Sequence, residues 1–325
     1  MIAIISTTRR RLRAAGWWLA ASVATVTLVM ILRSVAVTTV GTLVTGAVTA
    51  AALVPGVLGR VRLAPRRPAA MPVAPSVAAD APIVLFLPAH NEEATVADVV
   101  RRTPHRIADH PVRCLVIDDG STDRTAERAR AAGAEVITFE ENRGLGAAVR
   151  RGLDEAVARG AVAVAFCDAD GEYAPEEVPV LVAPILNGEA DYVVGSRFAG
   201  TIGRMLPHRR LGNRVLSLVL RFLTRTPISD GQSGYRALSR RAAGQARIVH
   251  DFNYAQVLTI DLLARGARYV EVPISYHFRE TGQSFVRLGE YLAAVIPAVH
   301  HQLSTDVDLP LPAEEPPRAT VRSAG

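Results

Sequence analysis

The chain has 325 residues, a hydrophobic content of 49%, a formal net charge of +6 and a sequence pI of about 9.9. This size allows one large domain or two small ones, with residues left over for a membrane segment. The positive charge is all arginine, but it is scattered and aromatic residues make up only 5%, which argues against a nucleic-acid-binding protein.

The N-terminal part contains two long apolar runs, residues 14–32 and 35–58. Each run is long enough to cross a hydrocarbon core of about 30 Å as a helix. Arginines flank the pair at 9–13 and at 60–67, so the positive-inside rule places both ends in the cytoplasm. We predict a two-helix transmembrane hairpin with basic flanks over residues 1–64, which anchors the chain at the cytoplasmic face of the inner membrane. A signal peptide and a buried soluble helix pair are the alternatives.

Residues 65–82 are rich in proline and alanine and are expected to form a linker. From residue 83 onward, short apolar runs alternate with stretches expected to be helical. The apolar runs are Ile83–Leu87, Val112–Ile117, Glu135–Phe139, Ala161–Phe166 and Asp191–Val194. The helical stretches are Glu93–Arg102, Asp123–Ala132, Leu145–Arg159 and Pro175–Leu186. This alternation predicts a mainly parallel, Rossmann-like α/β sheet with helices on both faces.

Polar clusters follow the first four expected strands. They read PAHNEE from residue 88, DDGSTD from residue 118, ENRGLGAAVRRG from residue 141 and DADGE from residue 168. In such a sheet, ligands bind beyond the carboxyl ends of the strands, so the four clusters are expected to share one edge. The third cluster lacks the G-x-G-x-x-G spacing of a dinucleotide fingerprint, which argues against a nicotinamide-dependent enzyme.

The fourth cluster concentrates negative charge directly behind an apolar strand. Asp168 and Asp170 lie two residues apart, so in an extended segment both project to one side. Like charges held so close are unfavourable unless a cation lies between them. Mg²⁺ or Mn²⁺, with oxygen ligands from carboxylates, water and phosphate, is the natural partner. The cluster therefore predicts a metal ion that bridges the protein to a diphosphate.

The ordered series of motifs from about residue 83 to 289 resembles the family 2 glycosyltransferases of the GT-A fold, and among them the dolichyl- or polyprenyl-phosphate mannosyltransferases. Besides the four clusters, the series contains GSRF from residue 195, DGQSGYRAL from residue 230 and EVPISYHFRETGQS from residue 271. The resemblance implies a domain over residues 83–289 that transfers sugar from a GDP- or UDP-sugar with Mg²⁺ or Mn²⁺.

The resemblance also implies roles for individual residues. Those expected around the nucleotide sugar are Pro88, Ala89, Asn91, Glu92, Asp118, Asp119 and Asp168. Those expected to bind the metal are Asp168, Asp170 and Glu172, the last of which stands where relatives often have glutamine. Catalytic roles fall to Asp170, Arg197, Arg279 and Asp230, and contacts to an acceptor phosphate fall to Arg209, Arg210 and Asn213.

The expected reaction is inverting transfer to a polyprenyl phosphate. An alcohol acceptor needs a general base, for which Asp230 is the candidate, whereas a phosphate monoester with a second pKa near 6 is already anionic. Transfer to a soluble or polysaccharide hydroxyl is the runner-up, and a non-catalytic, membrane-anchored binder of sugar nucleotides is the alternative from another class.

Three further features complete the expectations. Residues 290–308 are expected to form an interfacial helix or an ordinary helix packed on the core, and residues 309–325 a disordered tail. Cys114 and Cys167 lie in apolar runs, which indicates buried, reduced thiols instead of a disulfide. The donor, the oligomeric state and the pathway cannot be predicted from these residues.

Overall fold

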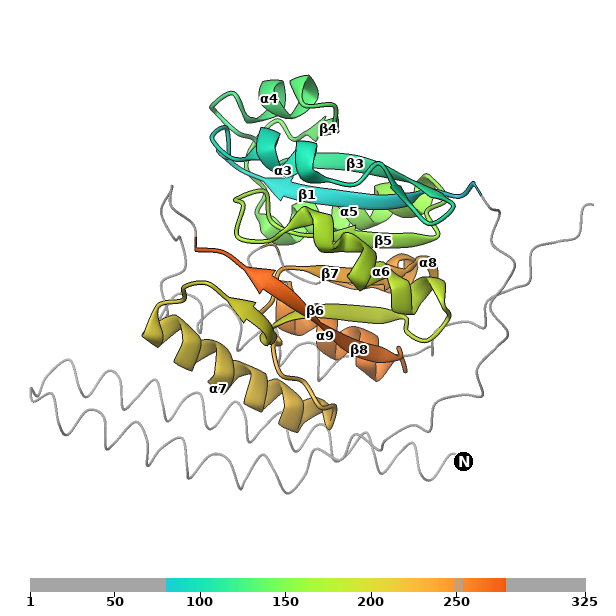
Figure 1. Cartoon of the computed structure of the whole chain (residues 1–325), viewed down its shortest axis with the longest axis vertical. Helices are drawn as coiled ribbons and strands as arrows, with labels where there is room; N and C mark the ends of the chain where they lie inside the picture. Colours follow the sequence, from blue (N-terminus) through green and yellow to red (C-terminus); the bar gives the residue numbers. More distant parts are fainter. Residues whose placement is uncertain (1–79, 249–250, 252–253, 279–325) are drawn as a thin grey trace, which may run out of the picture. The chain divides into compact units, whose positions relative to one another are not determined.

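The β-α alternation expected from the sequence is present in the computed structural model, which describes residues 80–248, 251 and 254–278 (Figure 1). The predicted hairpin over 1–64, the linker up to residue 79, the helix over 290–308 and the tail over 309–325 lie outside the described residues. Within the described part, no helix is both long and apolar enough to cross a membrane.

The strands are β1 (Ile83–Ala89), β2 (Arg106–Ile107), β3 (His110–Asp118), β4 (Glu135–Thr138), β5 (Ala163–Phe166), β6 (Tyr192–Ile202), β7 (Arg236–Ser239) and β8 (Tyr269–Tyr276). The helices are α3 (Val96–Arg102), α4 (Thr125–Ala131), α5 (Leu145–Ala158), α6 (Val178–Leu186), α7 (Pro207–Thr224), α8 (Arg240–Gln245) and α9 (Ala255–Ala264), with a 3₁₀ turn at Pro175–Glu177. All nine segments expected from the sequence correspond to elements of the same type, with ends that differ by a few residues except at β6, which runs on to Ile202.

The strands of the described residues form one mixed sheet with the order β2-β3-β1-β5-β7-β6-β8, and β4 pairs with β3. The pairs of β1 with β3, β1 with β5, β3 with β4 and β6 with β8 are parallel. The strand β7 runs antiparallel to both β5 and β6. The sheet is therefore mainly parallel, as predicted, with β7 reversed inside it and the short β2 reversed at its edge.

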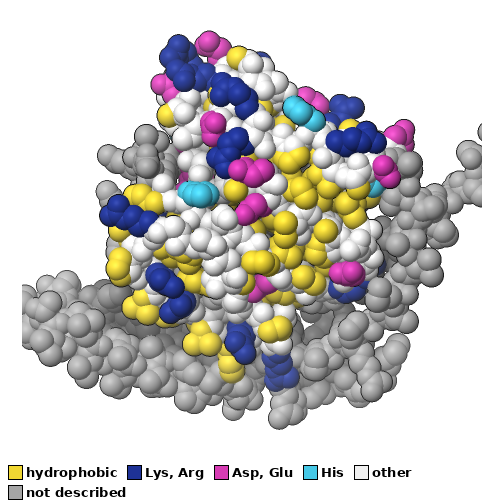
Figure 2. All heavy atoms as spheres, in the orientation of Figure 1, with side chains coloured by type: hydrophobic (Ala, Val, Ile, Leu, Met, Phe, Trp, Pro, Cys, Tyr) yellow, Lys and Arg dark blue, Asp and Glu magenta, His cyan; other side chains and the backbone are white. Residues whose placement is uncertain are grey.

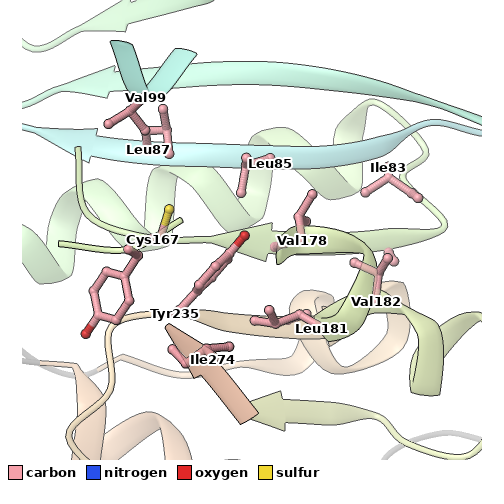
Figure 3. Packing of buried hydrophobic residues seen from close by; sticks show 14 of the residues in the cluster. Ile83, Leu85, Leu87, Val99, Cys167, Val178, Leu181, Val182, Tyr235 and Ile274 are labelled. Carbon is pink, nitrogen blue, oxygen red and sulfur yellow. The ribbon is translucent and has the colours of Figure 1, made fainter. Parts of the chain in front are cut away.

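Two hydrophobic layers cover the sheet. Along β1 the side chains alternate, so that Leu85 and Leu87 face one layer while Phe86 faces the other. The first layer contains side chains of α3 and α6, and Figure 3 shows them packed against β1, Cys167 and Tyr235. The second layer contains side chains of α5, α8 and α9. Because both faces are covered, the strands contain near-continuous apolar runs.

Glycine at position 152 lets α5 lie close against the sheet. A Cβ atom there would come within 2.3 Å of the Phe86 ring, which stacks on Phe166 with ring centroids 4.8 Å apart. Both cysteines carry free thiols, as predicted, and burial raises the pKa of Cys114 to about 11. Both thiols therefore contribute to packing, and a raised pKa disfavours the reactive thiolate form.

Candidate active site

The loops that follow β1 and β3 are bonded to each other. Ala89 and Asp118 are partners in the parallel register, so the two loops start side by side. Asn91 holds them together: its backbone N–H donates to Ser121 Oγ at 2.9 Å, and its Oδ1 accepts from Thr122 N at 2.9 Å. Asn91 has a φ of 56°, a left-handed conformation that asparagine tolerates better than most residues. Asn91, predicted to lie at the nucleotide, thus holds the two loops together.

The two aspartates of the DDGSTD cluster are both buried, and both accept hydrogen bonds from backbone N–H groups. Asp118 Oδ1 accepts from Ser121 N at 3.1 Å, which closes the turn after β3. Asp119 accepts from Arg143 N at 2.7 Å and from Gly144 N at 2.8 Å, one bond on each oxygen. Asp119 thereby fixes the loop that leads into α5, a contact that the sequence motif does not reveal.

Thr95 connects the first cluster to the DADGE cluster. Its hydroxyl lies 2.8 Å from the carbonyl oxygen of Ala169 and 3.3 Å from Glu92 Oε2. Glu92 also contributes to the electrostatic field at Asp168, whose pKa it raises. The structure therefore brings the carboxylate of Glu92 to the same edge as the predicted metal ligands.

Asp168, Asp170 and Glu172 form a cluster of like charge just after β5. Burial raises the pKa of Asp168 to about 8, with further increases from Asp170 and Glu172 that outweigh the opposing effect of Arg197. Burial also raises the pKa of Glu172, and the negative charge of Asp170 raises it further. The fold holds these carboxyl groups together at a cost that a bound cation would remove.

The predicted metal site consists of these carboxylates. Within the described residues, no three His, Cys, Asp or Glu side chains are placed to hold a metal ion by themselves. Glu172 is engaged elsewhere, since Tyr276 donates to its carboxylate and Arg209 Nη1 lies 3.7 Å from Oε1. Mg²⁺ beside a diphosphate usually takes only one or two protein carboxylates. Asp168 and Asp170 fit such a site, and the role of Glu172 as a further ligand stays a prediction.

Arg197 and Asp230 form a buried ion pair. The Nε and Nη2 atoms of Arg197 lie 2.7 and 2.8 Å from the two Asp230 oxygens, and its backbone N–H donates to Oδ2 at 3.0 Å. Asp230 has no exposed surface. Glu271 holds the adjoining loop by accepting from the N–H groups of Ser229 and Asp230 at 2.9 and 3.2 Å. Both oxygens of Asp230 are therefore occupied by Arg197, and the role of Asp230 as a general base stays a prediction.

The three residues predicted to meet the acceptor phosphate lie on α7. Arg209 points toward Glu172, while Arg210 is exposed. The amide of Asn213 lies 4.0 Å from the sulfur of Met205. Arg209 therefore contacts the carboxylate edge, and the acceptor-phosphate roles of all three residues stay predictions. Arg279 lies outside the described residues, so its predicted position over the phosphates stays a prediction.

Gly234 is a site residue that the motif analysis did not single out. Its N–H donates to the hydroxyl of Tyr173 at 2.7 Å, and a Cβ atom on it would lie 2.6 Å from Asp168 Oδ2. The loop before β7 must therefore approach Asp168 with no side chain between them. The glycine in DGQSGYRAL was visible in the sequence, but the carboxylate that it contacts lies 66 positions earlier in the chain.

Comparisons with known proteins identify the chain's relatives. Residues 84–246 match the family model described as glycosyl transferase family 2. A glycosyltransferase from Haloferax volcanii, AglJ, is 32% identical over 62% of this chain and 64% of its own length, somewhat less than two thirds.

Two further relatives have names that state an acceptor or product. UDP-N-acetylglucosamine–dolichyl-phosphate N-acetylglucosaminyltransferase from Methanococcus voltae is 34% identical over 50% of this chain and 72% of its own length. Polyprenol monophosphomannose synthase from Mycolicibacterium smegmatis is 34% identical over 62% of this chain and 79% of its own length.

Among solved structures, glucosyl-3-phosphoglycerate synthase from Mycobacterium tuberculosis, in complex with Mn²⁺, UDP-glucose and phosphoglyceric acid, superposes with a TM-score of 0.56. It is 27% identical in sequence, and the match covers 70% of this chain and 81% of that one. The sheet with its covering helices is therefore the GT-A type that the sequence predicted.

Proposed function

This chain belongs to glycosyltransferase family 2, and from that premise we propose that it transfers a sugar from a nucleotide diphosphate to a polyprenyl phosphate. The reaction inverts the sugar carbon by direct displacement. The names of the relatives from Methanococcus voltae and Mycolicibacterium smegmatis support this acceptor class, since each contains a polyprenyl or dolichyl phosphate or its sugar product. The donor is a GDP- or UDP-sugar.

The carboxylate edge supports the donor site. Asp168 and Asp170 would hold Mg²⁺ or Mn²⁺ against the donor diphosphate, where the ion supplies positive charge for the leaving phosphate. Arg197, fixed by Asp230, contributes a permanent positive charge beside the same carboxylates. Asp118 and Asp119 hold the neighbouring turns in place for the nucleotide.

The observation that carries the acceptor proposal is the occupied state of Asp230. Both of its oxygens accept from Arg197, so the candidate general base is already committed to an ion pair. A hydroxyl acceptor needs such a base, whereas a phosphate monoester is anionic at neutral pH without one. Arg209, beside Glu172, is placed to attract that anion. The geometry thus favours an acceptor that arrives with its own charge.

A hydroxyl acceptor remains the second candidate. The supporting observation is the solved relative from Mycobacterium tuberculosis, which was crystallised with phosphoglyceric acid and whose match covers most of both chains. Under this alternative the Arg197–Asp230 pair must open during turnover to free a base.

The location that we propose for the protein is the cytoplasmic face of the membrane. The two apolar runs over residues 14–58, with arginine on both flanks, support it. Alkaline extraction of membranes from expressing cells tests this location. An integral hairpin keeps the protein in the pellet, and release into the supernatant would rule it out.

The proposed function is tested by transfer of labelled sugar into an organic-extractable lipid. Membranes from expressing cells receive polyprenyl phosphate, Mg²⁺ or Mn²⁺ and a panel of GDP- and UDP-sugars. We expect an acid-labile, lipid-soluble product from one donor and none from the Asp170→Asn variant. Asp154→Asn, which changes an exposed carboxylate on α5, is the matched control and should keep full activity. Transfer only to a soluble or polymeric hydroxyl would favour the second candidate.

A further inference from the structure

One face of α7 packs on the domain in the usual way. Leu220 is buried, and Ser217 Oγ accepts a hydrogen bond from Gly231 N at 3.0 Å. These two residues belong to the side of the helix that contacts α9 and the loop before β7. A surface helix packed on one side normally presents polar residues on the other.

The opposite side of α7 is apolar instead. The exposed large hydrophobic residues on this helix are Leu211, Val215, Leu218, Val219 and Phe222, and Leu211 and Leu218 are each 65% exposed. In the whole described part of the chain, only Leu145 and Val180 also belong to this exposed class. The five residues recur at intervals of three and four, so they form one stripe along the helix.

Arginine is the charged residue type that accompanies this stripe. Arg210, Arg214 and Arg221 are exposed on α7, and the sequence of the helix contains neither aspartate nor glutamate. In Figure 2, hydrophobic and arginine side chains alternate along the lower left edge of the described part, the region of α7 in Figure 1. Arginine stems can lie along an apolar surface while their charged ends reach phosphate groups.

We propose that the exposed face of α7 is a lipid-binding surface that lies in the head-group region of an anionic bilayer. A helix with an apolar stripe and a purely basic polar face has the chemistry that inserts at such an interface. A protein partner would have to cover five apolar side chains and match the arginines with acidic groups, whereas an anionic bilayer supplies both acyl chains and phosphate groups. The contact does not depend on which acceptor the enzyme uses.

The position of Arg209 gives this surface a consequence for the site. Arg209 lies on the same helix and reaches to within 3.7 Å of Glu172 at the carboxylate edge. A bilayer in contact with α7 would therefore hold that edge at the level of lipid head groups. An anchor elsewhere in the chain limits the distance of the domain from the membrane, whereas contact through α7 fixes its orientation.

Fluorescence quenching by brominated lipid tests the proposal in the full-length protein reconstituted into vesicles. Trp17 and Trp18, the two native tryptophans, are first replaced by phenylalanine. Leu218→Trp then reports on the stripe, with Val215→Trp as a second probe should the first variant fold poorly. Glu127→Trp, at an exposed position of α4, is the matched control.

We expect the Leu218→Trp emission to be blue-shifted and to lose most of its intensity in brominated phosphatidylserine vesicles, while the Glu127→Trp emission is unchanged. Replacing Arg210, Arg214 and Arg221 by glutamine should weaken the quenching. Water-like emission from both α7 probes would overturn the proposal. Blue-shifted emission without quenching would also overturn it, since protein would then cover the stripe. Quenching without formation of any lipid-linked sugar would support the surface and contradict the proposed acceptor.

Discussion

The Asp230→Asn variant separates a positioning role from a proton-transfer role. Arg197 places three donors within 3.0 Å of Asp230, which has no exposed surface. Asparagine keeps the shape but removes the charge and turns an N–H group toward the guanidinium. Loss of one partner from a buried ion pair costs about 3–5 kcal/mol, because the remaining charge has no counter-ion. We therefore expect the free energy of unfolding to fall by roughly that amount, together with kcat/KM.

The assay combines denaturant unfolding with the pH dependence of kcat/KM for labelled lipid product. If Asp230 only orients Arg197, the shape of the pH profile is unchanged in the variant. The double variant Arg197→Met with Asp230→Leu should recover most of the lost stability and none of the activity, because it leaves no buried charge. Asp154→Asn should stay within about 0.5 kcal/mol of the parent. The reasoning fails if Asp230→Asn is as stable as the parent while the acidic limb of the profile disappears, since that outcome identifies a general base.

Three further predictions concern the carboxylate edge. Gly234→Ala brings a Cβ atom to 2.6 Å from Asp168 Oδ2, so we expect the carboxylate to move and turnover to fall about 100-fold. Gly244→Ala, which would meet nothing nearer than 3.9 Å, should stay active, and equal activities for the two variants would contradict the prediction. Burial raises the pKa of Asp168 to about 8, so between about pH 4 and pH 8 the folded metal-free protein binds more protons than the unfolded chain. Its stability should therefore decrease as the pH rises, by up to about 1.4 kcal/mol per pH unit from this group. In denaturant unfolding, Mg²⁺ should weaken this decrease, and the Asp168→Asn variant should lack it. If the unfolding free energies of the parent and the variant fell equally with pH, the decrease would not come from Asp168. Arg209→Gln should raise the KM for polyprenyl phosphate and leave the KM for the donor unchanged, and a rise in the donor KM alone would place Arg209 at the other substrate.

The first half of the domain was predictable because local pattern and tertiary structure agree there. The strands β1 and β5 and the second half of β3 are buried on both faces, so they appear in the sequence as apolar runs bounded by polar clusters. The helix α5 follows its predicted bounds to within one residue, at Leu145–Ala158. In this region the hydrophobic pattern alone determines the elements.

The second half was less predictable because its strands carry polar residues. The strand β7 begins at Arg236, which is fully buried and donates to Ser233 O at 2.8 Å and to Gly231 O at 3.0 Å. Arginine is among the residues that are rarely buried, so a sequence pattern places it at the surface. Its burial depends on carbonyl groups of the preceding loop, whose conformation is fixed only when the whole sheet forms.

In the candidate site, too, the positions of neighbouring residues were predictable from the sequence, whereas long-range hydrogen-bond partners were not. The spacing of Asp168 and Asp170 predicts that the two carboxylates lie together, and the structure places them in one cluster. It does not predict that the oxygens of Asp119 accept from residues 143 and 144, or that Asp230 pairs with Arg197. These partners are separated by 24, 25 and 33 positions, and only the sheet topology brings them together.

This distinction decides what the aspartates of the motifs can do. Asp119 and Asp230 each accept bonds on both oxygens from groups of the chain itself, so their charge already serves to hold a loop or an arginine. At Asp168 the surroundings disfavour the negative charge instead, since burial and neighbouring carboxylates raise its pKa despite the opposing effect of Arg197. A carboxylate in such a position gains most from a cation that arrives with a ligand. We therefore expect sugar transfer at this edge to depend on Asp168 for the donor, and the engaged Asp230 is our reason for proposing an acceptor that needs no base.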